Sequence, residues 1–219
     1  GKTGRTAIDA MMDLQLLWWA YDVTGNEKYF QPAYEHCRNT IKELIREDYS
    51  TIHVLDFDLE TGETIRKITV QGYSNNSCWS RGQAWAIYGF TLAYKYTKDE
   101  LFLKTAKNLA EYFIKNLPED FVPYWDFDDP EKEIRDSSAA AIASSALLDL
   151  SELGGREEFR EVAIKILSSL CDNYLTTEEE DGILKHGCFH KPAGMGVDES
   201  LIWGDCYFVE ALTKLKERK

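Results

Sequence analysis

The sequence predicts an all-α protein built of helical hairpins, arranged as a toroid or a curved solenoid, with one inserted β-hairpin. Two observations predict the helices: a helix–turn–helix pattern that occurs three times, and a contrast between apolar first helices and amphipathic second helices. A third observation, alternating apolar and polar residues over 51–72, predicts the β-hairpin. The 219 residues, 44% of them hydrophobic, suffice for one folded domain.

Each copy of the repeat contains a helix, a short polar turn and a second helix. In the second helix an aromatic residue and an alanine lie four positions apart, and therefore on one face. These pairs are Tyr29 and Ala33, Phe102 and Ala106, and Phe159 and Ala163. The pattern predicts three αα-hairpins.

The first helices of the hairpins, over 11–21, 84–94 and 139–150, are apolar nearly all round. This composition is typical of buried helices. The second helices, over 32–46, 101–117 and 159–174, mix Lys and Glu with Leu, Ile and Ala. We therefore expect an inner layer of buried helices inside a solvated outer layer.

Three long insertions separate the helices. In residues 51–72 the turn is expected near Gly62. With a loop of two or three residues, His53 would lie opposite Val70 or Gln71, which puts His53 and Gln71 at the open end of the hairpin, beside the helices. The other insertions cover 118–136 and 176–198. Long structured loops that join buried helices commonly hold the functional site.

Composition excludes several classes of partner and suggests a compartment. The formal net charge of −13 opposes binding to nucleic acid or to an anionic membrane, because these need a basic surface. The sequence shows no run of about 18 apolar residues and no signal-peptide pattern at its start. Its five cysteines are odd in number and include no CxxC pair, which favours a reducing compartment and predicts a cytoplasmic protein.

Two places in the chain could carry chemistry. Arg81 and Trp85 are four residues apart at the start of the second inner helix, where a guanidinium could take a carboxylate and an indole could face a sugar ring. The alternative, which patterning alone favours, is that Trp79 and Trp85 are core residues and Arg81 pairs with an Asp. Asp9 lies at the entry of the first inner helix and is either a partner of the helix dipole or a cap, or an acid/base that faces a cleft; Asp13 follows one turn later. The capping interpretation is favoured there.

No metal site or cofactor is expected. His186, Cys188 and His190 have no evident fourth zinc ligand, and glycine and proline beside them argue against a helix. The acidic run over 126–129 lacks the glycine and the closing glutamate of an EF-hand loop.

Five motifs, read together in their order along the chain, resemble the unsaturated glucuronyl hydrolases of glycoside hydrolase family 88. They are Thr6-Ala-Ile-Asp9-Ala-Met-Met, Trp79-Ser-Arg-Gly-Gln-Ala-Trp85, Pro123-Tyr-Trp-Asp-Phe-Asp-Asp129, Arg135-Asp-Ser-Ser-Ala-Ala-Ala141 and Leu201-Ile-Trp-Gly-Asp205. The resemblance runs nearly end to end.

The resemblance implies a partial (α/α)6 toroid. Residues 1–219 would be a single catalytic-domain fragment that lacks the family's N-terminal hairpins and a second essential Asp. A companion N-terminal chain or a homo-oligomer would then cover inner helices that are otherwise open to water.

The resemblance also implies a reaction. The family removes a 4,5-unsaturated glucuronic acid from the non-reducing end of lyase-generated oligosaccharides, by hydrating the vinyl ether rather than by attack at the anomeric carbon. Asp9 stands at the position of the acid/base. The positions that the resemblance assigns to the sugar are His53, Gln71, Arg81, Trp85 and His190.

Two alternatives to this function stay open at the level of sequence. One is an unsaturated rhamnogalacturonyl hydrolase, which shares the fold and the chemistry. The other is a helical-repeat scaffold that binds a protein partner on its concave face and catalyses nothing.

Overall fold

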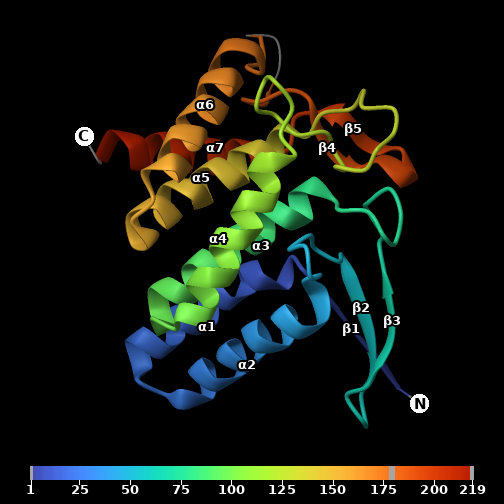
Figure 1. Cartoon of the computed structure of the whole chain (residues 1–219), viewed down its shortest axis with the longest axis vertical. Coiled ribbons are helices and arrows are strands. Elements are labelled where there is room, and N and C mark those ends of the chain that lie inside the picture. The colour runs from blue at the N-terminus through green and yellow to red at the C-terminus, as the bar shows by residue number, and fades with distance from the viewer. Residues whose placement is uncertain (1, 178–180, 218–219) are drawn as a thin grey trace.

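The computed structural model describes residues 2–177 and 181–217, and its helices form a two-layer arc. The inner helices are α1 (Ala10–Thr24), α3 (Ser80–Thr97), α5 (Ser137–Gly154) and α7 (Ile202–Glu217), each packed on the next. The outer helices are α2 (Glu27–Leu44), α4 (Glu100–Lys115) and α6 (Glu157–Asn173), and each packs against the inner helix that precedes it. The arrangement is a partial α/α toroid, as predicted (Figure 1).

Local sequence sets several of the helix ends. Asn26 and Asp99 begin α2 and α4 by accepting hydrogen bonds from the backbone N–H two residues later. Gly25 and Gly155 end α1 and α5 with left-handed backbones, a conformation that costs glycine little. These caps explain why each hairpin turns where the repeat pattern predicts.

Of the three inner helices predicted to be buried, two are. Helices α3 and α5 are buried on nearly every face. For α1 the prediction is wrong, because only Met11, Leu14 and Trp18 are buried, while Leu16 is 68% and Trp19 58% exposed. Helix α1 packs mainly on α2 and α3 and lies at one end of the arc, so part of its surface faces solvent. At the other end α7 likewise exposes apolar side chains, namely Ile202, Val209 and Leu212.

The predicted hairpin is present as β2 (Val54–Asp58) and β3 (Thr64–Ile68), and β1 (Thr3–Ala7) adds an antiparallel third strand that was not predicted. Arg5 of β1 and Arg66 of β3 both donate hydrogen bonds to Asp56 between them. They hold the pKa of that carboxyl well below its usual range.

The predicted register of this hairpin is wrong. Val54 pairs with Ile68, because the loop spans residues 59–63 and a bulge follows Asp56. Asp58 stabilises the longer loop by accepting hydrogen bonds from the N–H groups of Glu60 and Thr61.

The third insertion also contains strands, so the prediction of a single inserted hairpin was incomplete. Strands β4 (Gly187–His190) and β5 (Met195–Glu199) are antiparallel and joined by a short 3-10 turn, η1 (Lys191–Ala193). The backbone N–H of Ser137, at the start of α5, donates to the carbonyl of His186, while Trp79, just before α3, forms a β-bridge with Asp126. The insertions therefore meet where α3 and α5 begin.

Across the described ranges, no helix combines the length and apolarity needed to cross a bilayer. The five cysteines are free thiols. Burial raises the pKa of Cys37, Cys78 and Cys188 to about 12, whereas Cys171 and Cys206 are exposed.

Candidate active site

A cavity of about 310 Å³ lies where the first turns of α1 and α3 face the open end of the β2–β3 hairpin, strand β4 and the start of α7. Its lining is aromatic with a few polar groups, as is usual for small-molecule sites. The lining residues are Asp9, Met12, Asp13, Gln71, Trp79, Arg81, Trp85, Phe189 and Trp203.

Four of the six residues assigned from sequence therefore line one cavity: Asp9, Gln71, Arg81 and Trp85. They come from the residue before α1, the segment after β3, and α3, and thus from separate parts of the chain. His53 lies beside Asp9, with its Nε2 3.6 Å from Oδ2 of Asp9. The folded chain brings five of the six candidates together.

The carboxylate of Asp9 is not used as a helix cap. Asp9 immediately precedes α1 with a helical backbone, and its side chain makes no capping hydrogen bond. The side chain is 38% exposed, and its Oδ2 lies 3.6 Å from Nε2 of His53. The capping interpretation that the sequence favoured is therefore wrong, and the carboxylate is available to a ligand.

His53 is buried, and its orientation is fixed by backbone groups. Its Nδ1 accepts hydrogen bonds from the backbone N–H groups of Val70 and Gln71, each at 3.2 Å. An Nδ1 that accepts carries no proton, so the proton of the neutral ring is assigned to Nε2, the atom that faces Asp9. The ring stacks on Trp79 with 4.5 Å between centroids.

The open end of the hairpin is tied to the start of α1, which sets the distance between His53 and Asp9. The backbone N–H of Ile8 donates to the carbonyl of His53 at 2.9 Å. Ile8 itself is fully buried. The histidine and the carboxylate are thus held by adjacent, anchored backbone segments.

Arg81 is buried and already paired on one side. Its Nη1 donates to Oδ2 of Asp136 at 2.7 Å and to the carbonyl of Cys188 at 2.5 Å, and its Nη2 donates to the carbonyl of Phe189 at 2.7 Å. Pairing with an Asp, the alternative that the sequence left open, is therefore present. A guanidinium has five N–H groups. Within the described residues, the Nε–H and one N–H of Nη2 have no partner.

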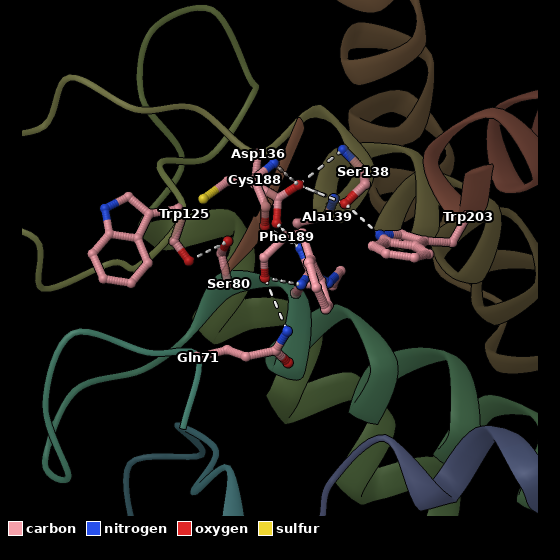
Figure 2. A network of polar contacts seen from close by, with 10 residues as sticks. Gln71, Ser80, Trp125, Asp136, Ser138, Ala139, Cys188, Phe189 and Trp203 are labelled. Atoms are coloured by element: carbon pink, nitrogen blue, oxygen red, sulfur yellow. Dashed lines mark hydrogen bonds and ion pairs between the residues drawn. The ribbon is translucent and has the colours of Figure 1, made fainter. Parts of the chain in front are cut away.

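Gln71 and Phe189 join the hairpin to strand β4. The side-chain amide N–H of Gln71 donates to the carbonyl of Phe189 at 2.9 Å, the same oxygen that accepts from Arg81 (Figure 2). This bond assigns the amide orientation and leaves the oxygen of Gln71 as its free acceptor at the cavity. Phe189 was not identified from sequence, because its contribution is a backbone carbonyl.

Three indoles surround the cavity in different settings. Trp79 is buried, as the core interpretation predicted, and the guanidinium of Arg81 lies 4.5 Å from its ring. Trp85 is half-buried and contacts Tyr207 edge to face at 5.3 Å. Trp203 lies in the last of the five family motifs, from which no site residue was predicted. It lines the cavity, and its indole N–H donates to Oγ of Ser138 at 3.2 Å.

His190 lies outside this set. Its Nδ1 accepts a hydrogen bond from the backbone N–H of Ala193 and so begins the turn between β4 and β5. It does not line the cavity. The assignment of His190 to the sugar therefore finds no support in its position.

The acidic and histidine-rich segments are built into the protein framework. In the described part of the chain, no three His, Cys, Asp or Glu side chains are placed to hold a metal ion together. His186 contacts Asp198. Asp126 accepts from the backbone N–H of Tyr73 and from Ser77, and burial raises the pKa of its carboxyl.

The sequence is similar to one family of known enzymes. The model of Glycosyl Hydrolase Family 88 matches residues 5–216. The chain is 41% identical over 214 residues to the unsaturated glucuronyl hydrolase of Formosa agariphila, covering 94% of this chain and 54% of that protein. It is 40% identical over 219 residues to the unsaturated chondroitin disaccharide hydrolase of Streptococcus pneumoniae, covering 96% and 55%.

A solved structure gives the same result. The unsaturated glucuronyl hydrolase of Bacillus sp. GL1 superposes with a TM-score of 0.95 at 38% identity, covering 98% of this chain and 59% of that one. The chain thus spans a little over half the length of the relatives it matches.

Proposed function

The chain belongs to Glycosyl Hydrolase Family 88, and from that premise we propose that the complete protein removes a 4,5-unsaturated glucuronic acid from the non-reducing end of lyase-generated oligosaccharides. One observation carries the proposal. The carboxylate of Asp9 makes no helix-capping hydrogen bond and faces His53, whose tautomer is fixed by backbone donors. Asp9 lines an aromatic cavity that is also lined by Arg81. A general acid/base needs this combination of access and fixed orientation.

In the proposed reaction Asp9 acts first as an acid and then as a base. Its carboxyl proton goes to C4 of the vinyl ether, and water adds at C5 as the carboxylate takes a proton from it. The resulting hemiketal opens to a ketone at C5, and the hemiacetal left at C1 expels the remaining sugar. His53, with its Nε2 3.6 Å from Oδ2 of Asp9, orients the carboxylate.

Recognition of the sugar is assigned to the remaining cavity residues. The two unpartnered N–H groups of Arg81 suit a carboxylate, the oxygen of Gln71 suits a hydroxyl, and Trp85 offers an apolar face to the ring. Among the described residues that line the cavity, Arg81 supplies the positive charge. A small anionic disaccharide can bind there although the protein carries a net charge of −13, which repels long polyanions.

The exposed ends of the arc support a further part of the proposal. Large apolar side chains on α1 and α7, among them Trp19 and Ile202, are exposed to solvent. Surfaces of this kind are normally covered. We assign them to contact with further helical hairpins of a companion N-terminal segment or chain, or with a second copy. Residues 1–219 would then form one part of a catalytic domain, and free cysteines support a cytoplasmic location.

The test uses matched disaccharides that differ only in the C4=C5 double bond. The complete protein is expected to remove the ultraviolet absorbance of an unsaturated glucuronyl disaccharide and to leave its saturated counterpart intact, because only the former contains a vinyl ether. Equal cleavage of both would indicate attack at the anomeric carbon and would refute the proposal. A preference for pectin-derived over glycosaminoglycan-derived substrates would favour the rhamnogalacturonyl alternative.

A further inference from the structure

Asp136 touches several elements of the candidate site without lining the cavity. It is fully buried at the start of α5. Its Oδ1 accepts from the N–H groups of Ser138, Ala139 and Cys188 and from Oγ of Ser138. Its Oδ2 accepts from Nη1 of Arg81 at 2.7 Å. Figure 2 shows this carboxylate at the centre of the network.

The two carboxylate oxygens therefore bind different groups. Capping a helix requires one acceptor oxygen, and Oδ1 supplies it to the first turn of α5. Oδ2 takes no part in the cap and is directed at the guanidinium. An N-cap alone would be served by Ser, Thr or Asn, so the second oxygen points to a role beyond helix capping.

The contact with Asp136 fixes the plane of the Arg81 guanidinium. Both N–H groups of Nη1 are committed, to Asp136 and to the carbonyl of Cys188, and one of Nη2 is committed to the carbonyl of Phe189. Three bonds on one side of a planar, rigid group leave no rotational freedom. The two remaining N–H groups keep one direction.

A second branch of the network reaches Trp203. Oγ of Ser138 donates to Oδ1 of Asp136 at 2.5 Å and accepts from the indole N–H of Trp203 at 3.2 Å. Trp203 lines the cavity, and the Arg81 guanidinium lies 5.4 Å from its ring. One buried carboxylate thus connects a cation and an aromatic wall of the same site.

We propose that Asp136 is a positioning residue, which holds the Arg81 guanidinium and, through Ser138, the Trp203 indole in the geometry that receives the carboxylate and ring of the unsaturated sugar. This inference rests on the proposed function of the cavity. Substrate binding, rather than the proton transfer at Asp9, is the step that Asp136 serves.

The variant Asp136→Asn isolates the contact with Arg81. The amide oxygen of Asn can retain the four contacts of Oδ1, whereas its NH2 group would face the donor Nη1 of Arg81. We expect KM to rise about tenfold with kcat changed less than about twofold, because a displaced guanidinium weakens ground-state and transition-state binding alike. A merely structural role would reduce the fraction of active enzyme and so lower apparent kcat at unchanged KM.

Asp99→Asn is the matched control. Asp99 also caps a helix with Oδ1 and accepts a side-chain donor on Oδ2, here Tyr34, but it does not line the cavity or contact Arg81. This variant should leave KM unchanged. If Asp136→Asn leaves KM unchanged as well, the positioning role is refuted.

A measurement on the wild-type protein separates this inference from the proposed function and does not depend on the folding of a variant. In NMR spectra of the complete, unliganded protein, we expect the guanidinium N–H groups of Arg81 to give separate, slowly exchanging signals. A single averaged signal would show a freely rotating guanidinium and overturn the inference. Separate signals in a protein that does not cleave the unsaturated disaccharide would refute the proposed function while leaving the positioning network intact.

Discussion

The close approach of α1 to α3 at Gly89 gives a prediction that tests how the fold positions Asp9. A Cβ atom at residue 89 would lie 2.5 Å from Cβ of Met11 and 3.3 Å from its carbonyl oxygen. Met11 is buried, and its Cβ cannot move without the backbone of α1. The variant Gly89→Ala must therefore push α1, which begins directly after Asp9, away from α3.

Two effects of Gly89→Ala oppose each other. Replacing glycine by alanine inside a helix stabilises it by about 1 kcal/mol. Overpacking a buried contact costs about 1–3 kcal/mol, and a separation of 2.5 Å, far inside carbon contact distance, places this case near the upper limit. The expected net loss is about 1–2 kcal/mol of unfolding free energy. A shift of Asp9 by about 1 Å should also reduce kcat by up to about 100-fold.

Urea denaturation of the complete protein measures the first effect, and initial rates on the unsaturated disaccharide measure the second. Gly154→Ala is the control. The Cβ added there meets Cε of Lys107 at 2.7 Å, the end of a flexible side chain that can move aside. Gly154→Ala should be neutral or slightly stabilising and fully active. If Gly89→Ala is as stable and active as Gly154→Ala, the close contact between the helices does not set the position of Asp9.

Three further predictions concern other parts of the molecule. In the native protein a thiol reagent should modify Cys171 and Cys206, because burial raises the pKa of the other three thiols; rapid reaction of all five would contradict their burial. Asp56→Asn should destabilise the protein. Because its two arginine partners depress the pKa of the wild-type carboxyl, the difference from wild type should be largest above about pH 4 and should shrink below it, where the unfolded wild-type chain binds a proton that the folded protein does not. Urea melts at pH 7 and pH 3 would show this, and a difference that grows toward low pH would contradict it. Trp19→Ser should increase the solubility of the isolated 219-residue chain by removing exposed apolar surface, and light scattering that is unchanged would argue that α1 needs no cover.

The sequence predicted those features of the fold that depend on local patterns. Helices α3 and α5 are apolar on all faces, and the structure buries them. The pattern of α1 looks the same, yet only three of its 15 residues are buried, because burial depends on which neighbours are present and not on the helix alone. The register of the hairpin was missed for a related reason, since a bulge and an Asx-stabilised loop leave little trace in an alternating pattern.

In the candidate site, too, local patterns predicted some features and missed those that depend on distant parts of the chain. The i, i+4 spacing and the family motifs identified Asp9, Arg81 and Trp85, which do line one cavity. Patterning favoured an Asp partner for Arg81, but it could not show that the partner is Asp136, which lies 55 residues away, or that a carbonyl of β4 also accepts from the guanidinium. Such contacts depend on how the chain folds back on itself.

The most direct test of the central claim compares two carboxylates in one cavity. Asp9 and Asp13 are one helical turn apart and both line the cavity, but Asp9 faces His53. For Asp9→Asn in the complete protein, the rate of loss of the unsaturated chromophore should fall by about 100-fold to 10,000-fold, the usual contribution of a general acid/base. The rate for Asp13→Asn should stay within about tenfold of wild type, since a nearby charge without a proton-transfer role contributes less. Undiminished turnover by Asp9→Asn would contradict the account.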